Sequence, residues 1–267
     1  MLCITRPLHQ IQRPGDIMTF SEIVTLLVVL AAVSLSVYLV HKYWPYTSRQ
    51  EHNDVAGFIF AAVSVLYGVL VAFVVIVGSE GLASARTTTY AEADQLANVY
   101  WMSRILPSPE GSDIQGLALK YAQTVIVDEW PLMGKDESSG QAQFLFDQMR
   151  SDVFEFMPRS DQQEAIYEQE LASINDLSAA RRDRLAAMNE TIPEPIWVVL
   201  IIGGVVTVCF CLLFGLRNRI VHAGTVATLA VLITISLFLI KNMQDPFANS
   251  PHIGPEAFRI FLSQAGQ

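Results

Sequence analysis

Charge is scarce in this sequence, and it is absent from four long apolar segments. Only 16% of the 267 residues are Asp, Glu, Lys or Arg, whereas ordinary soluble domains carry about 25%. The uncharged segments are residues 23–40, 55–79, 196–216 and 223–240. At about 1.5 Å per helical residue, segments of this length cross the roughly 30 Å core of a bilayer. The sequence therefore predicts an integral membrane protein with four spanning helices, whose first partner is the lipid bilayer.

Cysteine is almost absent and histidine is scattered. The three cysteines are Cys3, Cys209 and Cys211, and none lies between residues 80 and 194. This excludes a disulfide framework or a cysteine-based metal cluster in that segment. None of the five histidines has a second ligand at metal-binding spacing. We predict no metal site and no cofactor.

Motifs that carry enzyme chemistry are also missing. The chain contains no G-x-S-x-G nucleophile elbow, no P-loop and no dinucleotide fingerprint. The acidic pairs 128–129 and 136–137 lie in a segment so rich in Asp and Glu that such pairs carry no catalytic signal. We predict no catalytic residue and no enzyme activity. The uncharged spans also argue against a proton-coupled or ion-pair transporter, which needs ionisable groups within the membrane, but they are compatible with a channel.

The apolar segments divide the chain into five parts. We expect an N-terminal segment (1–22), a transmembrane hairpin (23–79), an extramembrane domain (80–194), a second hairpin (195–241) and a C-terminal tail (242–267). The first apolar run is too long for the core of a cleaved signal peptide. Met18, directly before that run, is an alternative translation start to Met1.

The extramembrane domain is acidic and helical. It holds nine Lys/Arg against twenty Asp/Glu, which argues against nucleic acid as a partner. No proline occurs between residues 57 and 106, so span two is expected to continue out of the membrane as one helix of about fifty residues. Apolar stripes predict further helices over 113–130, 139–157 and 160–189, and no strand alternation appears. The fold class is all-α.

An even number of spans places both termini and the domain on one side of the membrane. Eight Lys/Arg lie near span ends on that side, and four lie in the two short connectors. The positive-inside rule then predicts that the domain and both termini are cytoplasmic.

Span two carries small residues and large apolar residues, and two interpretations of this pattern are open. A face of small residues is typical of close helix–helix packing; its members are Gly57, Ala61, Ser64, Gly68 and Ala72. Alternatively, span two lines a pore in which large apolar side chains form a constriction that gates by dewetting. The candidate pore-lining residues are Tyr67, Leu70, Phe73 and Val77.

Several segments together resemble the bestrophin-like domain family of bacterial membrane proteins. These are GFIFAAVSVLYGVLVAFVVIV with AEADQLANVYWMSRILP, PEPIWVVLIIGG with LLFGLRN, and DPFANSPHIGPEAF after span four. The resemblance implies a homo-oligomer, a pentamer by analogy with bestrophins, that conducts small anions such as chloride through a neck lined by span two. It also implies a location in a bacterial inner membrane, and it marks Glu92, Asp245, Pro246 and Phe247 as family-pattern positions of unknown role.

Two functions remain open at this point. The first is a homo-oligomeric, anion-selective channel with an apolar neck. The second is a non-conducting membrane scaffold or sensor whose acidic helical domain binds a cytoplasmic partner.

Overall fold

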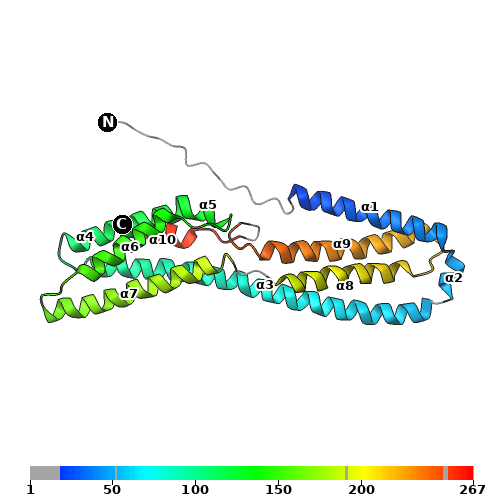
Figure 1. Cartoon of the computed structure of the whole chain (residues 1–267), viewed down its shortest axis with the longest axis horizontal. Coiled ribbons are helices and arrows are strands. Elements are labelled where there is room, and N and C mark those ends of the chain that lie inside the picture. The colour runs from blue at the N-terminus through cyan, green and yellow to red at the C-terminus, as the bar shows by residue number, and fades with distance from the viewer. Residues whose placement is uncertain (1–18, 52, 190–191, 249–251, 267) are drawn as a thin grey trace, which may run out of the picture. The chain divides into compact units, whose positions relative to one another are not determined.

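A computed structural model describes residues 19–51, 53–189, 192–248 and 252–266; Met18 lies outside them. Every regular element in these ranges is a helix, which confirms the all-α class. In chain order (Figure 1) the elements are α1 (Phe20–Tyr43), α2 (Tyr46–Gln50), α3 (Asn53–Ser103), α4 (Glu110–Thr124), the π-helix η1 (Val125–Glu129), α5 (Trp130–Met133), α6 (Gly140–Glu155), α7 (Asp161–Ala186), α8 (Glu194–Leu212), α9 (Arg219–Met243) and α10 (Glu256–Ala265).

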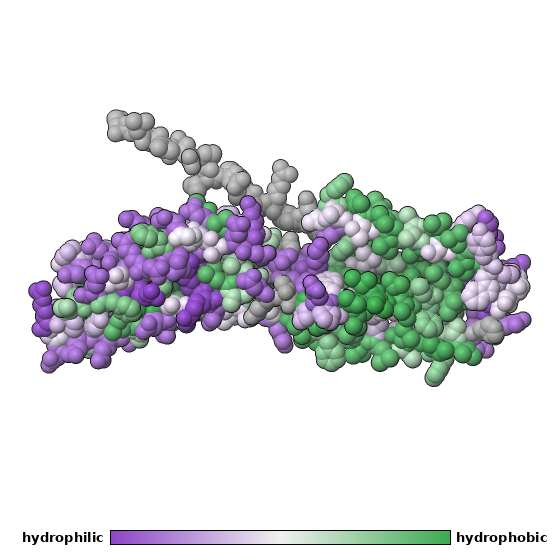
Figure 2. All heavy atoms as spheres, in the orientation of Figure 1, coloured by the Kyte–Doolittle hydropathy of each residue, from purple (hydrophilic) through white to green (hydrophobic). Residues whose placement is uncertain are grey.

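Among the described residues, four helices are long and apolar enough to cross a membrane: α1, α3, α8 and α9. They coincide with the four predicted segments, which confirms that prediction. Apolar side chains cover α1, α8, α9 and the first part of α3, whereas polar side chains predominate over α4, α6 and α7 (Figure 2). The hydrophobic surface of the first group is the surface that lipid or a neighbouring subunit has to cover.

Span two and the helix that follows it form one element. α3 contains 51 residues, so it is roughly 75 Å long at 1.5 Å per residue. This confirms the continuous helix predicted from the missing prolines. Its last residue is Ser103, four residues before Pro107.

The chain divides into two compact units, and α3 contributes to both. One unit comprises the described residues up to Tyr67 together with Ile201–Phe238. Its core joins three helices through Val33 and Val37 of α1, Cys211 of α8, and Val226 of α9. Span three ends earlier than predicted, at Leu212 rather than residue 216. The reason is that Arg49 donates hydrogen bonds to the carbonyls of Leu212 (3.0 Å) and Phe214 (2.9 Å), which stabilises the end of the helix.

The second unit comprises Gly68–Leu200 and the described residues from Leu239 on. Its hydrophobic core gathers side chains from α3, α4, α6, α7 and α10. The predicted helix over 113–130 is α4 followed by the π-helix η1, a local change of winding that apolar spacing does not reveal. The C-terminal tail contains α10, which was not among the predicted helices, and its Phe258 and Phe261 are buried in the core.

One carboxyl group in this core has no hydrogen-bond partner. Glu170 of α7 is fully buried, and neither of its side-chain oxygens is paired within the described structure. Burial raises the pKa of Glu170 to about 8, because removal from water disfavours the charged form. Glu170 is therefore a neutral acid at pH 7 in the folded protein.

This gives a prediction about pH. Between the ordinary pKa of 4.5 and the raised value of about 8, the folded protein keeps a proton that the unfolded chain releases. Stability therefore falls as pH rises through this window. Glu170→Gln removes the titration, so its unfolding temperature should exceed that of the wild type at pH 9 by several degrees and should match it at pH 4.5. At about 2–4 °C per kcal/mol for a protein of this size, scanning fluorimetry resolves the difference.

The matched control is Glu168→Gln, because Glu168 is exposed and lies one turn or less from Glu170. Its unfolding temperature should follow the wild type at both pH values. A Glu170→Gln protein with an unchanged pH dependence would show that Glu170 is ionised in the folded state.

Candidate functional site

The two sides of α3 differ in burial. Tyr67, Val74, Ala85, Glu92 and Leu96 are buried and follow helical spacing along one side. Large apolar side chains on the other side are exposed, among them Phe58 (80%), Leu66 (72%) and Phe73 (64%). One protomer therefore leaves an apolar strip of its longest helix uncovered.

The four predicted pore residues do not share one environment. Tyr67 is buried against α8, so closely that a Cβ atom on Gly203 would lie 2.8 Å from its ring. Leu70 is half-buried. Phe73 and Val77 are 64% and 59% exposed. The structure thus leaves Phe73 and Val77 open to a neighbour or to an aqueous axis, and it places Tyr67 inside its own protomer.

The predicted small-residue face is also divided. Gly57 approaches Phe214, and Ser64 is half-buried. Ala61, Gly68 and Ala72 are exposed, and a Cβ atom on Gly68 would meet no atom within 4 Å. The middle of this face is therefore free for close contact with another helix.

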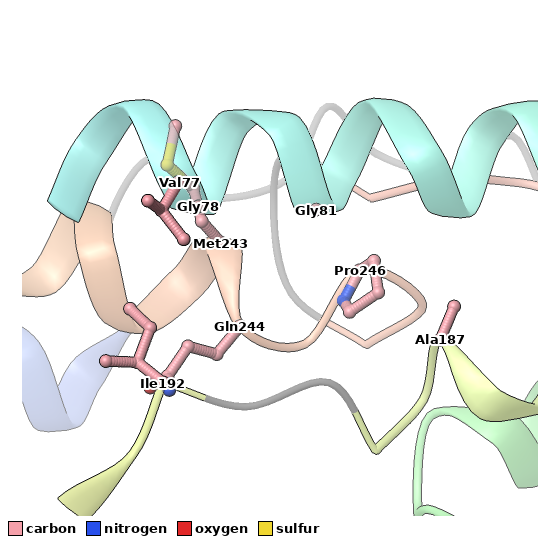
Figure 3. A pocket seen from close by; sticks show the side chains of 8 residues that line it. All are labelled: Val77, Gly78, Gly81, Ala187, Ile192, Met243, Gln244 and Pro246. Atoms are coloured by element: carbon pink, nitrogen blue, oxygen red, sulfur yellow. The ribbon is translucent and has the colours of Figure 1, made fainter. Parts of the chain in front are cut away.

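Val77 also borders a small cavity of about 210 Å³ between α3 and the end of α9 (Figure 3). Gly78 and Gly81 of α3 face it, and Met243 and Pro246 line it from the other side. A side chain on Gly78 would press on Met243, whose Cβ would lie 3.3 Å away. Glycine at position 78 allows the end of α9 to approach α3.

The second unit contains a buried cluster of four charges that the sequence did not predict as a group. Glu92 of α3 and Glu129 of η1 face Arg181 and Arg184 of α7. The Arg181 Nη2–Glu129 Oε1 distance is 2.7 Å and the Arg184 Nη2–Glu129 Oε2 distance is 2.6 Å. Arg184 Nε donates to Glu92, as does the hydroxyl of Tyr121. With two carboxylates against two guanidinium groups, the cluster is electrically balanced.

These contacts shift the ionisation of the groups involved. Burial alone would raise the pKa of Glu129, but the hydrogen bonds and charges of Arg181 and Arg184 hold it below its usual range. Burial and the nearby Glu92 carboxylate raise the pKa of Tyr121 well above its usual value. Glu129 therefore stays ionised, and the Tyr121 phenol stays neutral, at neutral pH.

The family-pattern positions fall in and around this cluster. Glu92 is one of its two carboxylates. Phe247 packs edge-to-face on Trp130, with ring centroids 5.6 Å apart. The Arg184 guanidinium lies over the same Trp130 ring at 5.4 Å, a cation–π contact. Asp245 and Pro246 belong to the segment that leads Phe247 to this position, and Asp245 accepts a backbone hydrogen bond from Ala248. Glu92 and Phe247 therefore take part in the packing of the second unit.

Sequence reasoning missed Glu129, Arg181 and Arg184, although a signal was present. Arg181 and Arg184 continue the apolar spacing of Ile174 and Leu177 along α7. Charged residues at buried helical positions indicate an internal ion pair. The partner carboxylates lie about 90 and 55 residues away, so the sequence alone could not pair them.

Loss of one partner leaves the cluster unbalanced. Arg184→Gln should lower the free energy of unfolding by about 3–5 kcal/mol, because two buried carboxylates would then share one guanidinium. The neighbouring Arg182 is exposed, so Arg182→Gln should change the free energy of unfolding by no more than about 0.5 kcal/mol. Urea unfolding in detergent, followed by tryptophan fluorescence, measures both. Equal effects of the two substitutions would contradict a structural role for the cluster.

The fold and these surfaces define a class: a membrane-spanning all-helical protein in which one long helix runs from the membrane segment into an extramembrane domain. The chain matches the bestrophin-like domain family over residues 27–258. It belongs to that family.

Solved structures share the fold at low sequence identity. A bacterial bestrophin homologue from Klebsiella pneumoniae is similar with a TM-score of 0.67 and 12% identity, covering 92% of this chain and 99% of that one. A membrane protein with a proline-to-alanine substitution is similar with a TM-score of 0.68 and 12% identity, covering 93% of this chain and 100% of the other. The search of curated proteins gave no match.

Proposed function

We propose that the protein is a homo-oligomeric ion channel in which the exposed apolar side of α3 lines the neck of the pore. The observation that carries the proposal is the uncovered strip with Phe58, Leu66 and Phe73 on a helix that should cross the membrane. Membership of the bestrophin-like family supports it.

The arrangement of α3 suits a ring. Successive residues of a helix are rotated by about 100°, so Phe73 and the exposed Gly68 and Ala72 lie on adjoining sectors of the surface. In a closed ring, one sector faces the axis and the adjoining sector meets the next subunit. Large side chains would then surround the axis, and small ones would allow close subunit contact. Five subunits remain a prediction from the resemblance.

Phe73 is the best candidate for the constriction. It is exposed and apolar, and it lies within the spanning segment 55–79, six residues before the end of that segment. A narrow ring of such side chains excludes water and thereby blocks ions. Val77 and Leu70 would flank it, whereas Tyr67, turned toward Gly203, would support the helix from behind.

The orientation of the protein in the membrane belongs to the proposal. We place the 80–194 domain and both termini in the cytoplasm of a bacterium, because more Lys and Arg lie near span ends on that side.

The permeant ion has two candidates. The family resemblance favours anions such as chloride. The charge on α3 favours cations. A stripe of exposed positions, spaced seven residues apart, runs through Ile59, Leu66, Phe73, Glu80, Thr87 and Asp94. Its apolar half continues into a polar half with two acids and no base. Rings of Glu and Asp are typical of cation-conducting pores.

The neck proposal predicts opposite results for two substitutions. Phe73→Ala should increase single-channel current in planar bilayers, because it widens an apolar ring. Gly68→Leu should reduce the fraction of oligomer in size-exclusion chromatography, since it adds bulk where a neighbouring helix would lie. Leu35→Ala, at an exposed position of α1, is the control and should change neither. If folded oligomers of the wild type and Phe73→Ala both fail to conduct, the non-conducting scaffold or sensor is the better account.

The two ion candidates are separated by a reversal potential under a KCl gradient. Anion selectivity predicts a value near the chloride equilibrium potential, and cation selectivity a value near that of potassium. If the channel is cation-selective, the double substitution Glu80→Gln and Asp94→Asn should shift the reversal potential toward the chloride equilibrium potential, because it reduces the negative charge along the axis. Glu168→Gln removes an exposed acid of α7 and should leave it unchanged.

A further inference from the structure

Arg49, in the short helix α2, is a buried cation with unused hydrogen-bond donors. Its side chain is 1% exposed. Nη1 donates to the carbonyls of Leu212 and Phe214, while Nε and Nη2 have no partner within the described structure. A guanidinium stays charged at any physiological pH, so the charge cannot be removed by deprotonation.

The unused donors form a specific shape. Nε–H and Nη2–H lie on one edge of the planar guanidinium, the edge that binds two oxygens of a carboxylate or phosphate in parallel. Nη1, on the other edge, is occupied by the end of α8. Arg49 is therefore held in place by one edge and offers the other to an oxyanion.

The neighbouring side chains do not fill this role. Asn53 is bonded to the backbone of Gly215 (2.8 Å), and His41 is bonded to His222 (3.0 Å). The described acids of the connector, Glu51 and Asp54, are exposed and form no ion pair with it.

The local charge is positive. Lys42, Arg217 and Arg219 add to Arg49 in the two connectors and adjoining helix ends, against Glu51 and Asp54. All four cations flank predicted membrane spans, so they lie where phospholipid headgroups lie.

An apolar groove begins near the end of α8, next to the Phe214 carbonyl that accepts from Arg49. It has a volume of about 630 Å³ and is lined by Phe60 of α3, by Phe214, and by His222, Thr225, Leu229 and Leu232 of α9. Ten residues separate His222 from Leu232, so the groove follows α9 for roughly 15 Å from the connector toward the middle of the span. Phe214 links the two features, because its side chain lines the groove and its carbonyl accepts from Arg49.

We propose that this end of the first unit binds a phospholipid, with the phosphate on the Nε/Nη2 edge of Arg49 and one acyl chain in the groove. A cation at the membrane boundary followed inward by an apolar channel is complementary to a lipid in both charge and direction. Both donors lie below the surface, so the exposed helix α2 has to shift as the phosphate enters. A second copy of the chain has the uncovered side of α3 to contact, and it would not explain the unpaired guanidinium edge.

The test uses the full-length oligomer in detergent and native mass spectrometry with added dioleoyl phosphatidylglycerol. The wild type should retain one lipid per protomer. Arg49→Gln should weaken binding at least tenfold, and Arg49→Lys, which keeps the charge but not the paired donors, should be intermediate. Thr225→Trp should also weaken binding by filling the groove while leaving Arg49 unchanged; Leu35→Trp, on exposed α1, is its control and should bind as the wild type does.

A parallel titration with inorganic phosphate distinguishes the two sources of the oxyanion. If phosphate binds tightly and Thr225→Trp retains lipid like the wild type, the site takes a free anion and the lipid proposal fails. Unchanged lipid binding in Arg49→Gln also overturns it. Benzoylphenylalanine in place of Thr228, which also lines the groove, provides a readout independent of stability. A lipid adduct supports the proposal, and a crosslink to a second protomer contradicts it.

Discussion

The second unit depends on a balance between two carboxylates and two guanidinium groups that are all out of water. Glu92 and Glu129 on one side and Arg181 and Arg184 on the other connect α3, η1 and α7, and Tyr121 adds α4. Through Trp130 and Phe258, Arg184 also contacts the C-terminal segment. Because these buried charges pair with one another across the helices, they favour one relative packing of α3, η1 and α7, and thereby the register of the extramembrane part of α3.

α3 carries that constraint into the membrane. One side of the helix is buried within the protomer: Glu92 and Leu96 are buried in one unit and Tyr67 in the other. The opposite side, with Phe73, is left without cover in the protomer. Because the buried side of the helix packs within the protomer, Phe73 and its exposed neighbours are the side chains left for contacts outside it. This is why we assign the neck to the exposed side.

The sequence predicted what depends on local pattern. Long uncharged runs gave the four spans, and the absence of proline gave the length of α3, because both follow from hydropathy and backbone chemistry along the chain. It did not predict the pairing of Glu92 with Arg184, since those residues are 92 positions apart and meet only after α7 folds back. The burial of Tyr67 depended on Gly203 in another span, and α10 depended on a core to bury Phe258. Glu92 and Phe247 stood out as family-pattern positions, but their contacts required three dimensions.

The orientation of α3 in the assembled oligomer is the central claim. Electron cryomicroscopy of the full-length protein in lipid nanodiscs tests it most directly. The account predicts a closed ring in which Phe73 of every subunit faces a central axis and Gly68 meets the adjoining subunit. A dimer without a central opening, or a ring in which Phe73 faces lipid, would contradict it.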